Sequence, residues 1–129
     1  MFEKLTISEL VEKLALDDMH LRRGASAQLL ARGEEGRNAM IQALVSENSA
    51  IRHEAILILS HSNHVFDESF LVSAAKDPSW GIRLVVIEPL KKIKTENAVA
   101  ALKGLLEDEY TYVQDAAMRA LEEIKASKT

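Results

Sequence analysis

The sequence predicts an all-helical protein built from repeated helix pairs. Residues that lose little conformational freedom on entering a helix, chiefly Ala, Leu, Glu, Lys and Arg, are abundant. Only 2 prolines and 5 glycines interrupt the 129 residues, and the alternation typical of strands is essentially absent. One pattern also recurs every 30 or 31 residues along the whole chain, which is the signature of a repeat protein.

The pattern consists of columns of residues that keep the same spacing. An apolar residue followed by a basic one recurs, with glutamine in the fourth copy, as Leu21-Arg22, Ile51-Arg52, Ile82-Arg83 and Val113-Gln114. Small and leucine columns follow it, at Ala25, Ala55, Val86 and Ala117 and at Leu29, Leu59, Leu90 and Leu121. An acidic column precedes it, at Asp17, Glu47, Asp77 and Asp108. We therefore expect one domain over 1–129, with repeats at about 6–33, 34–64, 65–94 and 95–129.

Each repeat predicts two helices joined near the acidic position. We expect helix pairs over 8–16 and 19–32, 35–46 and 49–60, 67–76 and 79–93, and 95–107 and 111–126. Thr6 and Glu9 have the spacing of a capping box, and Gly33 is a candidate C-terminal cap. Pro89 predicts a kink, because proline removes a hydrogen bond inside the helix that it interrupts.

The composition excludes several classes of protein. The chain has 16 basic and 20 acidic side chains with interspersed signs, which argues against a surface that neutralises nucleic acid. It has no cysteine, which fits a reducing compartment. No apolar run approaches the roughly 18 residues that a membrane span needs, and no signal-peptide pattern is present. We expect a cytoplasmic protein with no nucleic-acid or membrane partner.

The columns resemble the repeat of the HEAT family, most closely its short bacterial and archaeal type, first described in phycobilisome lyases. The residues that carry the resemblance are Asp77-Pro78 before Ile82-Arg83, and Ile51-Arg52 followed by Ala55 and Leu59. The resemblance covers nearly the whole chain. It implies an α-solenoid of about four helical hairpins, stacked as a right-handed superhelix with the second helices on the concave side.

The second helices predict a binding surface opposite their core-facing columns. Leu57 and Leu84 lie where a solvated helix would carry charge, with Leu30 beside them and Ile56 and Ile87 on the flank. An apolar patch with a charged rim is typical of a protein-binding groove, although deeper burial of the central helices would give the same pattern. The expected partner-binding residues are Arg23, Leu30, His53, Leu57, Trp80, Leu84, Glu88, Asp115 and Arg119. Trp80 could anchor a partner or fill the gap between adjacent turns.

One dipeptide is a candidate for metal-dependent catalysis. His53-Glu54 resembles the His-Glu motif of deoxyhypusine hydroxylase, a HEAT-like enzyme whose di-iron centre uses several such pairs. The equivalent positions in the other repeats are Arg23-Gly24, Leu84-Val85 and Asp115-Ala116. One pair supplies at most two ligands, fewer than a metal centre needs, unless a dimer brings two copies together.

Other candidate sites are weaker. His61 and His64 have a spacing that can chelate zinc, but a structural site usually needs four ligands. There is no Gly-rich phosphate loop, no G-x-S-x-G and no nucleophilic cysteine. We therefore expect no metal, no cofactor and no catalytic residues.

These observations favour a non-catalytic adaptor, scaffold or regulatory subunit that binds another protein on its concave face. The alternative is a phycobilin-lyase-like cofactor chaperone or a small HEAT-repeat enzyme. A third possibility is a homodimer closed by the exposed leucines.

The acidic and arginine columns predict a ladder that ties the turn of one repeat to the next. Replacing Arg52 with alanine should therefore lower the thermal midpoint, measured by circular dichroism, rather than abolish one chemical step. An unchanged midpoint would contradict the ladder interpretation.

Overall fold

The computed structural model describes residues 2–61 and 68–127. In these ranges all regular structure is helical, which confirms the predicted fold class. The chain divides into two compact units, Met1–His64 and Val65–Thr129, and each is considered by itself. No helix in the described ranges is both long and apolar enough to cross a membrane.

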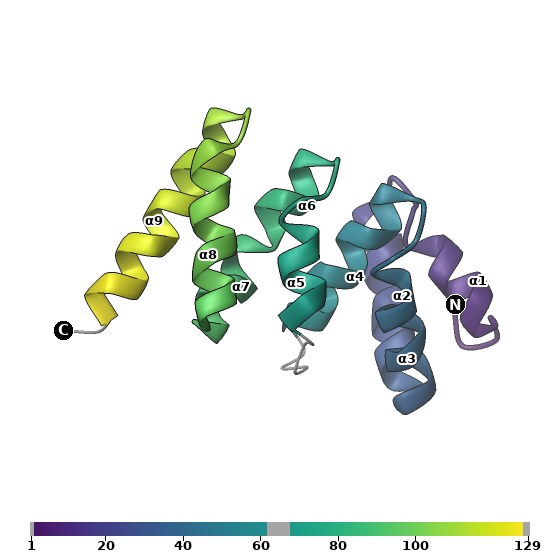
Figure 1. Cartoon of the computed structure of the whole chain (residues 1–129). Coiled ribbons are helices and arrows are strands. Elements are labelled where there is room, and N and C mark those ends of the chain that lie inside the picture. Colours follow the sequence, from purple (N-terminus) through teal and green to yellow (C-terminus); the bar gives the residue numbers. More distant parts are fainter. Residues whose placement is uncertain (1, 62–67, 128–129) are drawn as a thin grey trace. The chain divides into compact units, whose positions relative to one another are not determined.

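The first unit contains two helix pairs. They are α1 (Ile7–Lys13) with α2 (Met19–Ala31), and α3 (Glu34–Ala43) with α4 (Ser49–His61). Helix α3 packs against α1, α2 and α4 (Figure 1). The predicted columns supply its core, since Ala25, Leu29, Ala55 and Leu59 are fully buried.

The second unit contains the other two pairs. Helix α5 (Glu68–Ala74) is followed by α6 (Trp80–Val85) and α7 (Ile87–Ile93). Helix α8 (Glu96–Gly104) runs through a 3-10 turn (Leu105–Glu107) to α9 (Thr111–Ser127). Helix α9 packs against α6, α7 and α8, and Figure 1 shows α8 and α9 as an antiparallel hairpin.

The local signals at helix ends are confirmed. The Thr6 hydroxyl accepts from the amide of Glu9 at 3.1 Å, and the Glu9 carboxylate accepts from the amide of Thr6 at 2.9 Å. The bond from the Thr6 amide to the carboxylate lowers the pKa of Glu9. Gly33, between Arg32 and the start of α3, has φ 66° and ψ −136°, a positive-φ conformation that glycine adopts far more readily than other residues.

The kink expected at Pro89 is also present. The second helix of the third repeat breaks at Val86, which separates α6 from α7 one turn before the proline. Pro89 has no amide to donate to the turn before it, and its ring crowds that turn. The hydrogen bonds resume with Leu90, whose amide donates to the carbonyl of Val86 at 3.0 Å.

The basic column ties each second helix to the turn that precedes it. In every repeat its side chain donates to the carbonyl six residues earlier. The four pairs are Arg22 with Leu16 at 2.7 Å, Arg52 with Ser46 at 2.7 Å, Arg83 with Asp77 at 2.8 Å, and Gln114 with Asp108. The amide of Gln114 therefore keeps this contact without the charge.

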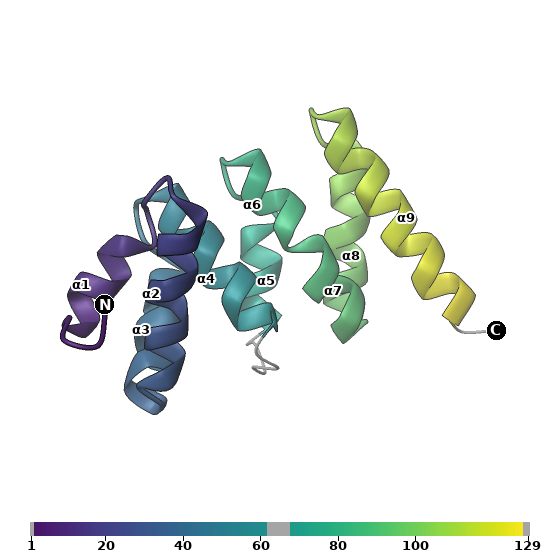
Figure 2. The same ribbon diagram turned by 180° about the vertical axis from the view of Figure 1, so that it is seen from behind.

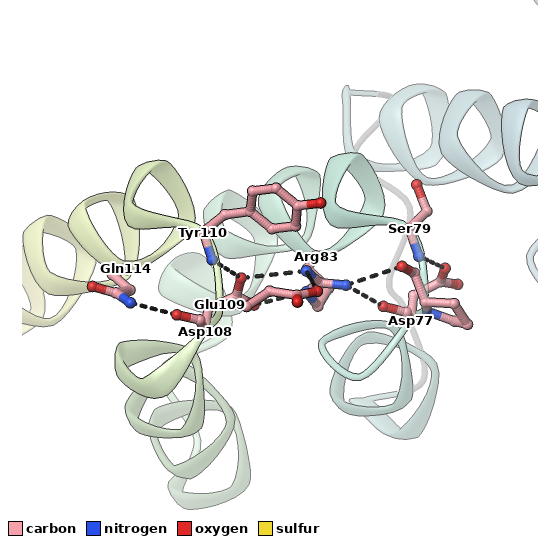
Figure 3. A network of polar contacts seen from close by, with 8 residues as sticks. Asp77, Ser79, Arg83, Asp108, Glu109, Tyr110 and Gln114 are labelled. Carbon is pink, nitrogen blue, oxygen red and sulfur yellow. Dashed lines mark hydrogen bonds and ion pairs between the residues drawn. The ribbon is translucent and has the colours of Figure 1, made fainter.

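In the second unit the column also links neighbouring repeats, as the ladder interpretation requires. Arg83 Nε donates to Asp108 Oδ2 at 2.7 Å, and Nη2 lies 3.6 Å from the exposed carboxylate of Glu109 (Figure 3). The Arg83 and Asp108 side chains are 10% and 5% exposed. The hydrogen bond from Arg83 lowers the pKa of Asp108, although burial opposes this shift.

The acidic column of the first two repeats needs correction. The position six residues before the basic one holds Asp77 and Asp108 in repeats three and four, but Leu16 and Ser46 in repeats one and two. The hydrogen bonds of these side chains confirm that the column lies six residues before the basic position. Asp77, Asp108 and Ser46 each accept from the amide two residues ahead, at 2.9, 3.0 and 3.1 Å. Asp17 and Glu47 lie one residue off this column because their spacing to the arginine is shorter by one.

Replacing Asp108 with asparagine should destabilise the protein in a pH-dependent way. Because the folded pKa lies below the ordinary value, the carboxylate stabilises the fold above about pH 4. That contribution is lost as the pH falls through the lowered folded value. Urea unfolding at pH 7 should show a loss on the order of 3 kcal/mol, as for a broken buried ion pair.

The difference between wild type and Asp108→Asn should shrink as the pH falls below about 4. Glu109→Gln is the matched control, because that carboxylate is 76% exposed. It should change stability little. A difference that stays constant with pH would show that the charge of Asp108 does not contribute.

Candidate functional site

The nine residues expected to bind a partner divide between the two units. Helices α2 and α4 carry Arg23, Leu30, His53 and Leu57, while the second unit carries Trp80, Leu84, Glu88, Asp115 and Arg119. The four charged side chains and Trp80 are exposed, and His53 and the three leucines are half-buried. Ile56 and Ile87, the expected flanks of the patch, belong to the core instead.

The structure brings three of the nine residues together in the second unit. Leu84, Glu88 and Arg119 line a cavity of about 270 Å³ between α6–α7 and α9. Its other lining residues are Ile87, Lys91, Ala116, Ala120 and Glu123. Asp115 and Trp80 do not line it.

Lys91 links the two walls of this cavity. Its ammonium group lies 3.1 Å from the Glu88 carboxylate and pairs with Glu123 on α9. Hydrogen bonds to Glu123 and Glu88 raise the pKa of Lys91, against the effect of burial. Glu123 was absent from the expected site, although it follows Arg119 by four residues and so lies on the same helix face.

Trp80 packs within the protein. Its ring lies 5.8 Å from that of Tyr110, in a tilted arrangement, and Arg83 lies over the Tyr110 ring at 5.9 Å. Trp80 therefore fills space between the turns of adjacent repeats while 46% of it stays exposed. The two rings lie next to the Arg83–Asp108 pair, and Figure 3 shows Tyr110 beside it.

The least expected group is the carboxylate of Glu54 on α4. Glu54 is 5% exposed, and its Oε1 accepts from Arg22 Nε at 3.1 Å. Its Oε2 is buried and has no hydrogen-bond partner within the described residues. The other repeats place Gly24, Val85 and Ala116 at this position, so an acid in an apolar column was the available sequence signal.

The register explains why Arg22 pairs with Glu54. Arg83 pairs with the acid six residues before the basic position of the next repeat, but that position in repeat two holds Ser46. Serine has no charge to offer, and Arg22 instead binds the carboxylate of Glu54. Glu54 therefore performs in the first unit the pairing that Asp108 performs in the second.

The described residues do not form a metal centre. No group of three or more His, Cys, Asp or Glu side chains within them is arranged to hold an ion. His64 and the side chain of His61 lie outside the described part of the chain. His53 and Glu54 could supply only two ligands, and one oxygen of Glu54 is already bound by Arg22.

Fold and site together define a helical-repeat protein with a buried carboxylate on one second helix. A family model described as HEAT repeats matches residues 37–122, more than half of the chain. The chain belongs to the HEAT-repeat family. No curated protein matches it.

Among solved structures the chain is similar to human deoxyhypusine hydroxylase in complex with glycerol. The TM-score is 0.65 at 23% sequence identity, over 96% of this chain and 45% of that one. The chain thus spans less than half of the length of that enzyme. At this identity the likeness shows the fold alone.

This match corrects the expectation of a non-catalytic adaptor. The same fold, over almost all of this chain, occurs in an enzyme. The helical-repeat architecture therefore gives no reason to exclude catalysis. The expectation that the chain is not an enzyme was wrong, because the lack of familiar catalytic motifs is not sufficient to exclude catalysis.

Variants can test whether an acid at position 46 replaces Glu54 as the partner of Arg22. Glu54→Val, which installs the residue of repeat three, should destabilise the protein by about 1–2 kcal/mol, because it removes the charged hydrogen bond to Arg22 while the loss of the unbonded Oε2 offsets part of the effect. Adding Ser46→Asp should restore much of this loss, since it places an acid where Asp108 stands in repeat four.

Ser46→Asn in the same background is the matched control, because asparagine has the same size without the charge. Urea unfolding of the four proteins measures the effect. Equal stability of the aspartate and asparagine variants would contradict the proposed register.

Proposed function

We propose that this chain is one half of a HEAT-repeat enzyme with the architecture of deoxyhypusine hydroxylase. Its contribution to the active site would be His53 and Glu54. The match over 96% of this chain but 45% of that enzyme supports this division. A second array would then supply the remaining groups, and the reaction class would be hydroxylation.

The observation that carries the proposal is the free oxygen of Glu54. A buried carboxylate oxygen without a hydrogen bond costs about 1–3 kcal/mol or more. Valine or alanine, which occupy this position in repeats three and four, would avoid that cost. An unsatisfied buried polar atom in a folded protein needs an explanation, and a functional role is one.

The contacts of Glu54 give the group a defined orientation. Arg22 holds Oε1, while two carbonyls of the preceding turn, those of Leu16 and Asp17, hold the same guanidinium at 2.7 and 2.8 Å. The carboxylate is thus fixed from one side. Its Oε2 can accept a bond from a cation or a proton donor.

His53 precedes Glu54 on α4 and is half-buried. Its imidazole would be the second group of the pair. Because one pair supplies at most two ligands, this chain alone does not fit a complete metal centre. Its own residues would orient and hold one part of a shared site.

Three finer expectations from the sequence remain proposals. These are the phycobilisome-lyase type of the repeat, a cytoplasmic location, and the absence of nucleic-acid and membrane partners. The mixed signs of the 16 basic and 20 acidic side chains support the last of them.

The experiment is a titration of the isotopically labelled protein with cobalt(II), observed by NMR. We expect weak binding, because two ligands are available, with paramagnetic broadening centred on His53 and Glu54. His53→Ala should weaken binding roughly tenfold or more, the scale on which changes around a metal affect its affinity. The Glu54→Val, Ser46→Asp variant removes the carboxylate while an acid at position 46 should keep the protein folded, and we expect it to bind cobalt more weakly than the wild type.

His20→Ala is the matched control, because His20 is an exposed histidine at the start of α2. It should bind cobalt like the wild type. No broadening near His53 in the wild type, or equal binding by His53→Ala, would overturn the proposal.

A further inference from the structure

The chain's single tryptophan and both of its tyrosines lie at the turns of the second unit. Trp80 begins α6, Tyr110 directly precedes α9, and Tyr112 is the second residue of α9. Trp80 and Tyr110 are each 46% exposed, and Tyr112 is 70% exposed. Both turns lie at the same end of this unit (Figures 1 and 2). This end therefore presents aromatic side chains to solvent.

Repeat stacking does not require these aromatic side chains. In the other repeats the position of Trp80 holds Met19, Ser49 and Thr111. The position of Tyr110 holds Asp18, Asn48 and Ser79. None of these six residues is aromatic, so the contact between the two rings is particular to repeats three and four.

Tyr110 stands where the other repeats carry a residue that can cap the helix. Its carbonyl accepts the first hydrogen bonds of α9, from the amides three and four residues later, at 3.1 Å each. At the same position Asp18 and Asn48 also use their side chains, which accept from the amide three residues later at 3.1 and 3.3 Å. The phenol oxygen of tyrosine is too far from the backbone to do this. Repeat four thus gives up a capping bond and exposes a ring instead.

The surroundings of the rings are acidic. Residues 104–118 contain four acidic side chains and no basic one: Glu107, Asp108, Glu109 and Asp115. Arg83 binds Asp108 at 2.7 Å, but its Nη2 lies 3.6 Å from Glu109, which is beyond a hydrogen bond. The Glu109 side chain is 76% exposed. Its carboxylate can therefore accept a second cation from solvent.

Arg83 brings the rings and this carboxylate together. It lies 5.9 Å from the centre of the Tyr110 ring, which in turn lies 5.8 Å from that of Trp80 (Figure 3). A planar guanidinium group can stack on an aromatic face and donate to a carboxylate at the same time. An exposed aromatic surface beside an exposed carboxylate is suited to such a group.

We propose that Trp80, Tyr110 and Glu109 bind an arginine side chain presented by a basic segment of another polypeptide. The guanidinium group stacks on the exposed part of the rings and donates to Glu109. Glu107 and Asp115, which are both exposed, attract the further basic residues of the segment. This site lies wholly in the second unit, so it does not depend on the function proposed for His53 and Glu54.

Titration with a short arginine peptide tests the site through its own fluorescence, since Trp80 is the single tryptophan. The probe is acetyl-Gly-Arg-Gly-Arg-Gly-amide, whose blocked ends leave two guanidinium groups as its charges. We expect a saturable change in Trp80 emission at low ionic strength, with weaker binding in added salt. The same peptide with lysine should bind more weakly, because an ammonium group has no plane to stack on the rings.

Two variants separate the acidic and the aromatic parts of the site. Glu109→Gln should weaken peptide binding about two- to fivefold, the scale of an exposed ion pair. Trp80→Ser, which installs the residue of repeat two, should weaken it about fivefold or more. Because this variant lacks the fluorophore, its binding is measured from NMR shifts of the labelled protein. Circular dichroism establishes that each variant is folded.

Glu96→Gln is the matched control. Glu96 is exposed in the first turn of α8, at the far end of that helix from the turn before α9. Its replacement removes the same charge from the same unit and should leave peptide binding unchanged.

Unchanged Trp80 emission with the arginine peptide would overturn the proposal, as would equal binding of the arginine and lysine peptides. Equal losses in Glu109→Gln and Glu96→Gln would indicate general charge attraction and would also overturn it. If Trp80→Ser does not fold, the titration of Glu109→Gln decides, and unchanged affinity overturns the proposal. Peptide binding by a protein that shows no cobalt effect at His53 would contradict the proposed function and leave this inference intact.

Discussion

The hydrogen bond from the basic column to the carbonyl six residues earlier is the interaction on which the repeat depends. It occurs in all four repeats and survives the change from arginine to Gln114. The carbonyls that follow a first helix have no partner within it, so a side chain from the second helix satisfies them. This bond fixes how the second helix leaves the turn, and the buried leucine column then meets its neighbours.

The helices and the repeat could be predicted because they depend on local chemistry and on spacing. The 31-residue period located every second helix, and Thr6, Gly33 and Pro89 marked ends and a break through their own backbone preferences. The acidic column was misplaced in the first two repeats. A shift of one residue between acid and arginine changes which carbonyl and which side chain the guanidinium reaches.

The candidate site could be predicted only in part. His53 and Glu54 stood out as a pair, but Glu54 binds Arg22, which lies 32 residues earlier. Arg22 takes this partner because Ser46 stands where repeat four has the acid Asp108. Recognising this requires the correct register of the acidic column. Helical periodicity placed Ile87 on the flank of the apolar patch because it considers each helix alone, whereas in the structure Ile87 is buried and faces α9.

Glu54 connects the stability of the first unit with its possible chemistry. One of its oxygens pairs with Arg22 as an acidic column residue would, and the other has no hydrogen-bond partner in the part of the chain that the structure describes. If stacking were its whole role, an acid at Ser46 would serve equally well and leave valine in the core, as in repeat three. Keeping the carboxylate on α4, next to His53, places a fixed and incompletely bonded oxygen on a second helix. A purely structural ion pair does not explain this placement of the carboxylate.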